Sequence, residues 1–212
     1  MSLTKADVAR TAILRAALET FGRDGFKATT TRHIAERAGV SLPALKYYFG
    51  NKEGLYLAGA TEIVERFESE FGHLEEPLRA ELKAGMTPAQ ARARLKLTMS
   101  GLVDFLLGSE ESEVWRLFVL HEMSEPGPAF EVLYKNIWGR GIDLCSALVG
   151  AIVQKSARAV SVRIEALLMI SNVTAFERGR VVALRTLGWD DLGGRHLAAI
   201  KGAIESHIDR LE

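Results

Sequence analysis

The spacing of the apolar residues is the feature that most restricts the fold of this chain. Apolar side chains recur every three or four residues over long stretches, and only five prolines interrupt them. Near the C-terminus, for example, Leu197, Ile200, Ile204 and Ile208 form one helical stripe. No segment alternates in the way typical of a strand. The pattern predicts an all-α protein, and a length of 212 residues allows one large domain or two small ones.

About nine helices are expected, and local signals mark several of their ends. Thr30 or Thr31 can cap one helix start and Ser41 the next, because a hydroxyl oxygen accepts a free backbone amide of the first turn. Gly39 provides a helix stop between them. The helices are expected at residues 7–23, 31–38, 42–49, 52–72, 87–107, 109–123, 129–153, 159–187 and 191–211, with residues 75–85 a short helix or a loop.

The net charge of zero conceals an uneven distribution. Lys and Arg number 27, and so do Asp and Glu, and such a balance by itself argues against a nucleic-acid-binding protein. Residues 1–57, however, hold nine basic and five acidic side chains, so this segment carries +4 and the remainder −4. A basic N-terminal segment is suited to phosphates, and an acidic remainder disfavours DNA binding elsewhere on the chain.

Residues 31–50 fit the steric requirements of a helix-turn-helix. The motif needs a small residue where two helices approach each other and a turn residue that tolerates positive φ, and Ala35 and Gly39 supply these. Ile34, Ala38 and Leu45 fall where the helices would share a core. A plain helical hairpin is the alternative interpretation.

Residues 10–57 resemble the DNA-binding domain of the TetR family of bacterial transcriptional regulators. The similar run extends from Ile13 through Thr-Thr-Thr-Arg-His-Ile-Ala-Glu-Arg-Ala-Gly-Val-Ser to Tyr47-Tyr48-Phe49-Gly50-Asn51-Lys52 and Tyr56. The resemblance implies a three-helix DNA-binding domain over residues 1–57 and a larger helical domain over residues 58–212. Lys46 departs from the pattern, because the family usually has an aromatic residue there.

The helix-turn-helix prediction assigns DNA contacts by position. The N-terminal part of the second helix enters the major groove, and hydroxyl groups, helix-start amides and cations bind phosphates. The predicted DNA-binding residues are Thr31, Arg32, Ser41, Leu42, Pro43, Ala44, Lys46, Tyr47, Tyr48 and Lys52. The short apolar Pro43 and Ala44 are suited to thymine methyl groups, whereas Tyr48 could instead belong partly to the core.

The family resemblance also implies a homodimer on an inverted-repeat operator. Two helix-turn-helix domains would then contact half-sites about one turn of DNA apart. The last two helices are the candidate interface, through Leu167, Leu168, Leu197, Ile200, Ile204 and Ile208. The same stripes could instead form only the core of one subunit.

A second resemblance concerns the C-terminal part of the chain. Residues 47–58, 175–179 and 184–189 are similar to the CecR-type subfamily. The family implies a small-molecule effector, for which the candidate residues are Trp115, Phe118, His121, Glu122, Met123, Tyr134, Trp138 and Phe176. Aromatic residues at this spacing are more often core, and His121 and Glu122 could face solvent. The hypothesis is a repressor that the effector releases, with helix 52–72 as the lever.

Other classes of protein have weaker support. The five histidines lack metal-ligand or catalytic spacing, and Cys145 lies among apolar residues, so neither an enzyme nor a metal or other cofactor is expected. A ligand-independent architectural DNA-binding protein remains the main alternative. No apolar run approaches the length of a membrane span and no signal peptide is present, so a cytoplasmic location is expected, without membrane contact.

Overall fold

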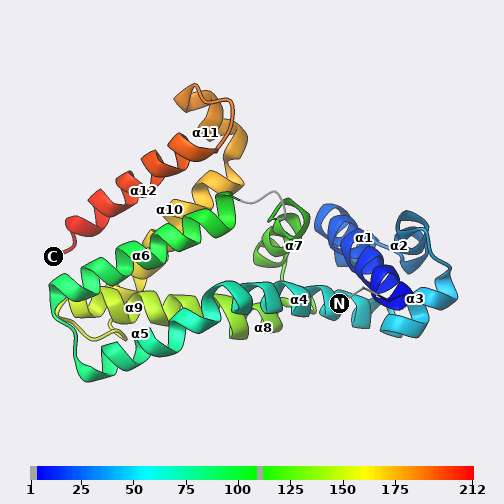
Figure 1. Ribbon diagram of the computed structural model, residues 1–212, viewed down its shortest axis with the longest axis horizontal. Helices are drawn as coiled ribbons and strands as arrows, with labels where there is room; N and C mark the ends of the chain where they lie inside the picture. Colours follow the sequence, from blue (N-terminus) through cyan, green and yellow to red (C-terminus); the bar gives the residue numbers. More distant parts are fainter. Residues whose placement is uncertain (1–3, 109–111) are drawn as a thin grey trace. The chain divides into compact units, whose positions relative to one another are not determined.

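A computed structural model describes residues 4–108 and 112–212, and its regular secondary structure over these ranges is helical throughout (Figure 1). This confirms the all-α prediction. None of the helices in these two ranges combines the length and apolar character needed to cross a membrane.

The helices pack as two compact units. The N-terminal unit comprises Met1–Glu70 with Glu113–Ile137, and the C-terminal unit comprises Phe71–Ser112 with Trp138–Glu212. The chain therefore passes between the units three times. The predicted boundary at residue 57 lies inside a helix of the N-terminal unit, and the packing divides the chain differently from the predicted domains, because residues 113–137 pack with the N-terminal helices.

Six helices form the N-terminal unit: α1 (Lys5–Ala28), α2 (Thr31–Ala38), α3 (Leu42–Phe49), α4 (Lys52–Phe67), α7 (Ser112–Ser124) and α8 (Phe130–Leu133). Helix α1 contacts α2 and α4, and α3 contacts the same two helices. Their inward faces bury Ile13, Phe21, Ile34, Leu45 and Leu55. This shared core fixes α3 on α2 and α4 and leaves its opposite face to solvent.

The C-terminal unit is built around a second apolar core. Its helices are α5 (His73–Ala84), α6 (Pro88–Leu107), α9 (Gly139–Val153), α10 (Val160–Arg178), α11 (Arg180–Leu187) and α12 (Gly194–Asp209). Helix α6 contacts α9, α10 and α12, so it is the central helix of this unit. Helix α11 follows α10 directly and precedes the turn into α12 (Figure 1).

Two helices expected to be continuous are divided in the structure. The predicted helix 129–153 consists of α8, a π-helical segment η2 (Tyr134–Trp138) and α9, and the predicted helix 159–187 is broken at Gly179 between α10 and α11. A second π-helical segment, η1 (Glu68–Gly72), ends α4. Segment 75–85, left open as a helix or a loop, lies mainly in α5. The expected start of one helix at Ser109 lies outside the described residues.

Helices α6 and α12 are also held together by polar side chains along their apolar contact. Lys96 Nζ lies 2.7 Å from Asp209 Oδ2, and Lys201 Nζ lies 2.6 Å from Asp104 Oδ2. The Arg92 guanidinium donates hydrogen bonds to the carbonyl oxygens of Ile208 and Leu211, at the C-terminal end of α12. The Leu211 amide also donates to the Ile208 carbonyl oxygen, at 3.3 Å, so Arg92 adds a charged donor to the carbonyl groups at this helix end.

Replacing Arg92 with alanine is expected to lower the free energy of unfolding by about 1–3 kcal/mol, because part-buried carbonyl groups lose a charged donor. Arg94→Ala is the matched control. Arg94 binds Glu81 at the surface, and loss of an exposed pair costs about 0–1 kcal/mol. Urea unfolding of both variants measures the difference, and equal losses would contradict the capping role of Arg92.

Candidate nucleic-acid interface

The turn between α2 and α3 is built by local capping. The Thr30 hydroxyl oxygen accepts the His33 amide at 3.2 Å, and the Ser41 hydroxyl oxygen accepts the Ala44 amide at 3.3 Å. Gly39 ends α2 in the left-handed region, with φ of 67°. Residues with a side chain rarely adopt a positive φ, so this turn position favours glycine. Of the two threonines considered, Thr30 is the cap.

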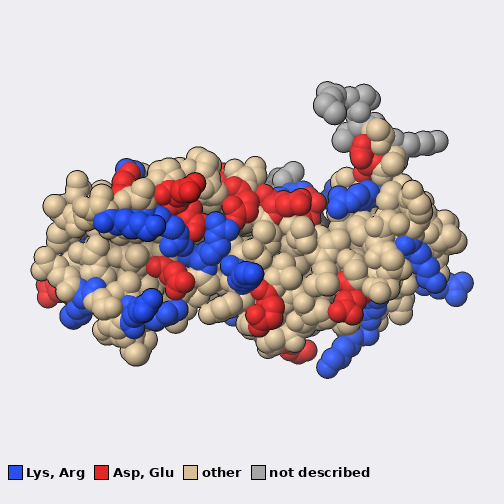
Figure 2. Space-filling view, turned by 90° about the horizontal axis from the view of Figure 1, so that it is seen from below, with Lys and Arg blue, Asp and Glu red and all other residues tan. Residues whose placement is uncertain are grey.

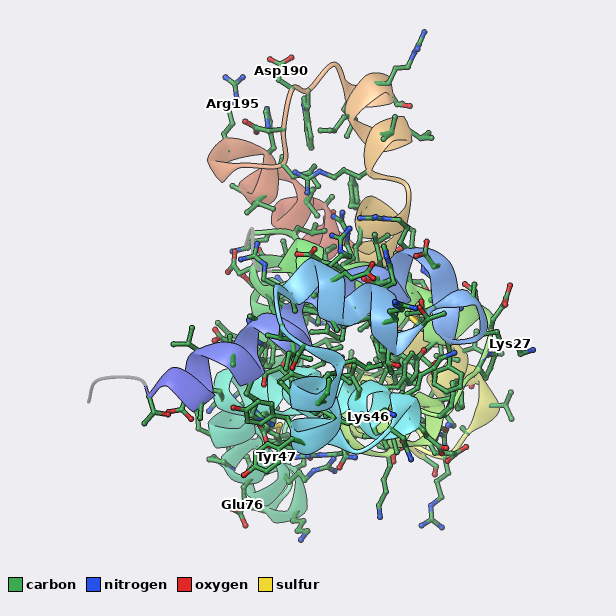
Figure 3. The ribbon with its side chains drawn as sticks, turned by 90° about the vertical axis from the view of Figure 1, so that its right-hand side faces the viewer. Lys27, Lys46, Tyr47, Glu76, Asp190 and Arg195 are labelled. Carbon is green, nitrogen blue, oxygen red and sulfur yellow. The ribbon has the colours of Figure 1, made fainter. Side chains whose placement is uncertain are left out.

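The α3 side that carries Lys46 and Tyr47 is open to solvent. Tyr47 is 85% exposed, and Lys46 and Pro43 are also exposed. Lys46 and Tyr47 lie on the side of the N-terminal helices that faces the viewer in Figure 3. Leu45, between Ala44 and Lys46, is fully buried. Helix α3 is thus anchored by one face and presents another that can approach a partner.

All ten predicted DNA-binding residues lie on α2, on α3, at the α3 cap or at the start of α4. Five are exposed and five are half-buried. The exposed residues are Arg32, Ser41, Pro43, Lys46 and Tyr47, and the half-buried residues are Thr31, Leu42, Ala44, Tyr48 and Lys52.

Several of these side chains already have partners within the unit, among them Tyr48 and Lys52. The Tyr48 ring lies edge-on to the Tyr47 ring, with centroids 5.3 Å apart. Lys52 Nζ lies 4.5 Å from the centroid of the Phe26 ring and donates to the Lys27 carbonyl oxygen at 3.3 Å. Lys52 therefore ties the start of α4 to the end of α1, besides placing a positive charge beside the helix-turn-helix.

The junction from α3 to α4 is tight. Asn51 caps α4 by accepting the Gly54 amide at 2.7 Å. A Cβ atom at Gly54 would lie 2.3 Å from the Phe49 carbonyl oxygen, so the close passage of the two helices requires glycine there. The end of α3 is consequently fixed to the first turn of α4.

An ion-pair cluster holds α2 on α1. Glu19 accepts hydrogen bonds from Arg37 Nη2 at 2.8 Å and from Arg15 Nε at 3.2 Å. Burial by itself would raise the pKa of Glu19, but the two guanidinium groups together outweigh it and hold the pKa below its ordinary value of 4.5. The charged form of Glu19 therefore stabilises the folded state.

This stabilisation is expected to depend on pH. It is fully present above pH 4.5 and is lost as the pH falls through the lower pKa of the folded state. Glu19→Gln should cost about 1 kcal/mol of unfolding free energy at pH 7 and much less near pH 3. Glu36→Gln, which removes a more exposed ion pair with Arg32, is the control. Urea unfolding at the two pH values measures both, and a Glu19→Gln cost independent of pH would contradict the cluster's role.

Helix α7 is bound to this DNA-binding part by a buried hydrogen bond. Tyr56 on α4 donates its hydroxyl proton to Glu122 Oε1 on α7 at 2.5 Å, and the Gly127 amide donates to Glu122 Oε2 at 3.1 Å. Both side chains are fully buried. Burial raises the pKa of Tyr56, and the hydrogen bond to the Glu122 carboxylate and its charge raise it further. The pairing of Glu122 with Tyr56 could not be predicted, because the two residues are 66 positions apart in the sequence.

The residues predicted to bind an effector are divided between the two units. In the N-terminal unit Trp115, Phe118 and Glu122 are buried, His121 is half-buried, and Met123 and Tyr134 are exposed. Phe118 packs on Tyr56, with ring centroids 4.6 Å apart, and Tyr134 stacks on Phe130. In the C-terminal unit Trp138 and Phe176 are half-buried, and Phe176 packs on the core of that unit. An open groove of about 440 Å³ lies between α5 and α6, and none of these eight residues lines it.

The six residues predicted for a dimer interface also differ in position. Leu167 and Leu168 on α10 are 46% and 50% exposed, and Leu197 on α12 is half-buried. Ile200, Ile204 and Ile208 instead lie in the core of the C-terminal unit, because this stripe of α12 packs on its own subunit's α6. In this structure the three isoleucines belong to the intramolecular core, the alternative that the sequence left open.

Cys145, weighed as a nucleophile, lies in the same core. Burial raises the pKa of its thiol to about 12, so the reactive thiolate is not accessible near neutral pH.

Comparison with known proteins agrees with the geometry of the N-terminal helices. Residues 13–58 match the model of the bacterial regulatory proteins of the tetR family, and residues 91–211 match the C-terminal domain of the HTH-type transcriptional dual regulator CecR. The chain is 30% identical to CecR of Shigella flexneri over 207 residues, which cover 97% of this chain and 92% of the relative. It is 52% identical to the regulator RutR of Escherichia coli K12 over 54 residues, 26% of each chain.

Among solved structures, AibR in complex with isovaleryl coenzyme A and operator DNA has a similar fold. The TM-score is 0.65 at 18% identity, covering 94% of this chain and 97% of AibR. The matches therefore extend over both the helix-turn-helix and the C-terminal helices. The chain belongs to the TetR family, with a C-terminal domain of the CecR type, and is a DNA-binding transcriptional regulator rather than an enzyme.

Proposed function

We propose that the protein is a homodimeric repressor that binds an inverted-repeat operator and leaves it when a small molecule binds its C-terminal helices. The exposed face of α3, anchored from behind by Leu45, carries the proposal. Pro43 and Ala44 would approach bases, and Lys46 and Tyr47 would contact bases or phosphates. Thr31 and Arg32 at the start of α2 would bind the DNA backbone, where helix amides favour an anion.

An unpaired face of the C-terminal unit supports the dimer. Helix α10 exposes large apolar side chains on one stripe, namely Val160, Ile164, Leu167 and Leu168. The outward face of α12 has a run of small exposed residues at matching spacing, Ala199, Gly202, Ala203 and Ser206, between the exposed charged residues Arg195 and Asp209. Large side chains of one copy facing small residues of the other allow two helices to approach closely, and a symmetric pair would make this contact twice. The proposed interface therefore keeps Leu167 and Leu168 and replaces the buried isoleucines by the small-residue face.

Release by an effector requires that the bound molecule favour one arrangement of the two DNA-binding parts. Helix α4 begins at the end of α3 and continues toward the C-terminal unit through η1, so it is the proposed lever. AibR, the structural neighbour, was crystallised with isovaleryl coenzyme A, and this molecule is a reasonable first probe for an effector.

Selection of bound sequences from a random DNA library, followed by a reporter assay, tests this function. The library should yield an inverted repeat, and a promoter that carries the repeat should be less active when the protein is present. Failure to enrich any sequence would contradict the proposed DNA recognition.

An activating role is the second candidate, because the relative CecR is described as a dual regulator. The same reporter distinguishes the two roles: promoter activity that rises when the protein is present would contradict repression at that operator.

A further inference from the structure

Helix α7 belongs to the same compact unit as the helix-turn-helix, although more than 60 residues separate them in the sequence. The chain passes between the two units at residues 70–71, 112–113 and 137–138. The first and third passages lie within the π-helical segments η1 and η2, where the regular helical hydrogen bonding is interrupted. The second leads directly into α7.

Three glycines allow α7 and the loop after it to fit the N-terminal helices. A Cβ atom at Gly22 of α1 would lie 2.7 Å from the Phe118 backbone nitrogen and 2.9 Å from Leu117 Cβ. One at Gly25 would lie 2.6 Å from the His121 ring, and one at Gly127 would lie 2.5 Å from Glu122 Oε1. The α1 backbone thus lies directly on α7, with no side chain between them.

Beside this contact lies the buried Tyr56–Glu122 hydrogen bond. The Tyr56 ring packs edge-on against Phe21 and Phe26 of α1 and at a tilt against Phe118 of α7, with centroid distances of 4.6–4.8 Å. A buried carboxylate is costly unless donors satisfy it, and here they are Tyr56 Oη and the Gly127 amide. A packed, hydrogen-bonded contact of this kind has one well-defined geometry.

We infer that Glu122 and Tyr56, together with the close approach at Gly22, are positioning residues for DNA binding. They make α7 move as one body with α1 and α4, so that a shift entering α7 from the C-terminal unit changes the position of α3. This inference rests on the proposed dimer, because position matters most when two copies of α3 must match two half-sites at once.

The test compares affinities for operators that differ only in half-site spacing. From the selected inverted repeat, a series is made with one or two base pairs inserted or removed at its centre. The wild-type protein should bind one spacing best. Tyr56→Phe, which removes only the hydroxyl group, and Gly22→Ala, which separates α1 from α7, should reduce that preference by about 5- to 150-fold, the usual range of coupling between sites.

Two matched variants control for general effects. Gly141→Ala adds a methyl group to a helical glycine of α9 that has nothing within 4 Å of the new atom. Glu125→Gln changes a polar group on an exposed residue next to α7 and leaves the buried Tyr56–Glu122 hydrogen bond in place. Both controls should keep the wild-type spacing preference. Thermal unfolding of every variant establishes that it is folded at the temperature of the binding assay.

The outcomes are distinct. A Tyr56→Phe protein that is less stable but keeps the full spacing preference would show that the contact only stabilises the fold, and would overturn the inference while leaving the proposed function intact. If the Gly22→Ala protein does not fold, the spacing preference of Tyr56→Phe alone tests the inference. Wild-type protein that binds no selected DNA would overturn the proposed function, and this inference with it.

Discussion

Replacing Leu168 with glutamate is expected to convert the proposed dimer to a folded monomer. Leu168 is half exposed on α10, in the apolar stripe that the proposed dimer would cover. A glutamate there meets water in the monomer but would be buried against the partner, where an unpaired charge is strongly unfavourable. The monomer should still fold, because Leu168 is not part of the core of the C-terminal unit. Analytical ultracentrifugation at micromolar concentration measures the mass, and far-UV circular dichroism the helix content.

A glutamate in the buried stripe of α12 should instead destabilise the fold of the subunit. Ile204 is only 5% exposed and lies in the core between α12 and α6, so Ile204→Glu should cost about 4 kcal/mol or more of unfolding free energy. Leu97→Glu on α6, at a leucine that is exposed outside the proposed interface, is the control and should leave mass and stability unchanged. A Leu168→Glu protein that remains a dimer would contradict the proposed interface.

The second large effect concerns Lys46. Lys46→Ala should lower the slope of log Kd against log salt concentration by about 1.8 for the dimer, which is about 0.9 for each lost phosphate contact. Between 50 and 200 mM salt this corresponds to roughly a tenfold smaller change in affinity. Titration of labelled operator at four salt concentrations gives the slope.

Lys83→Ala removes the same charge from an exposed lysine of α5 in the C-terminal unit and should leave the slope unchanged. Equal slopes for wild type and Lys46→Ala, with lower affinity for one base sequence only, would mean that Lys46 contacts a base instead of a phosphate.

The distribution of charge on the protein is consistent with DNA binding through the N-terminal segment. On the face seen in Figure 2, acidic and basic side chains are interspersed rather than separated into large patches of one sign. In the C-terminal unit several basic groups are paired with acids, including Lys96 with Asp209 and Arg94 with Glu81. The zero net charge therefore does not prevent DNA binding by a basic N-terminal segment, and paired cations elsewhere attract phosphates weakly.

Features that depend on neighbouring residues could be predicted from the sequence. Ser41 and Gly39 act within one turn of themselves, and the helix boundaries around them agree with the structure to the residue. The positions of the predicted DNA-binding residues follow from the same local geometry. Their roles in DNA binding stay predictions, which the selection and salt-titration experiments test.

Features that depend on distant residues could not be predicted. A stripe such as Ile200, Ile204 and Ile208 has the same spacing whether it meets its own core or a second copy, and here it meets α6 of the same subunit. Glu122, a candidate effector residue that the sequence could also place in solvent, is fully buried. Its partner, Tyr56, is brought to it only by the docking of α7, and Trp115 and Phe118 of the same helix are buried.

The most direct test of the account is the effect of α3 on sequence recognition. Wild-type protein and an Ala44→Glu variant are each used to select from the same random DNA library. Ala44 is half-buried near the start of α3, next to its exposed face, and a glutamate there would repel phosphates and occupy the space next to the bases. We expect an inverted repeat from the wild type and no enrichment from the variant, with unchanged thermal stability. Enrichment of the same repeat by both proteins would contradict recognition through α3.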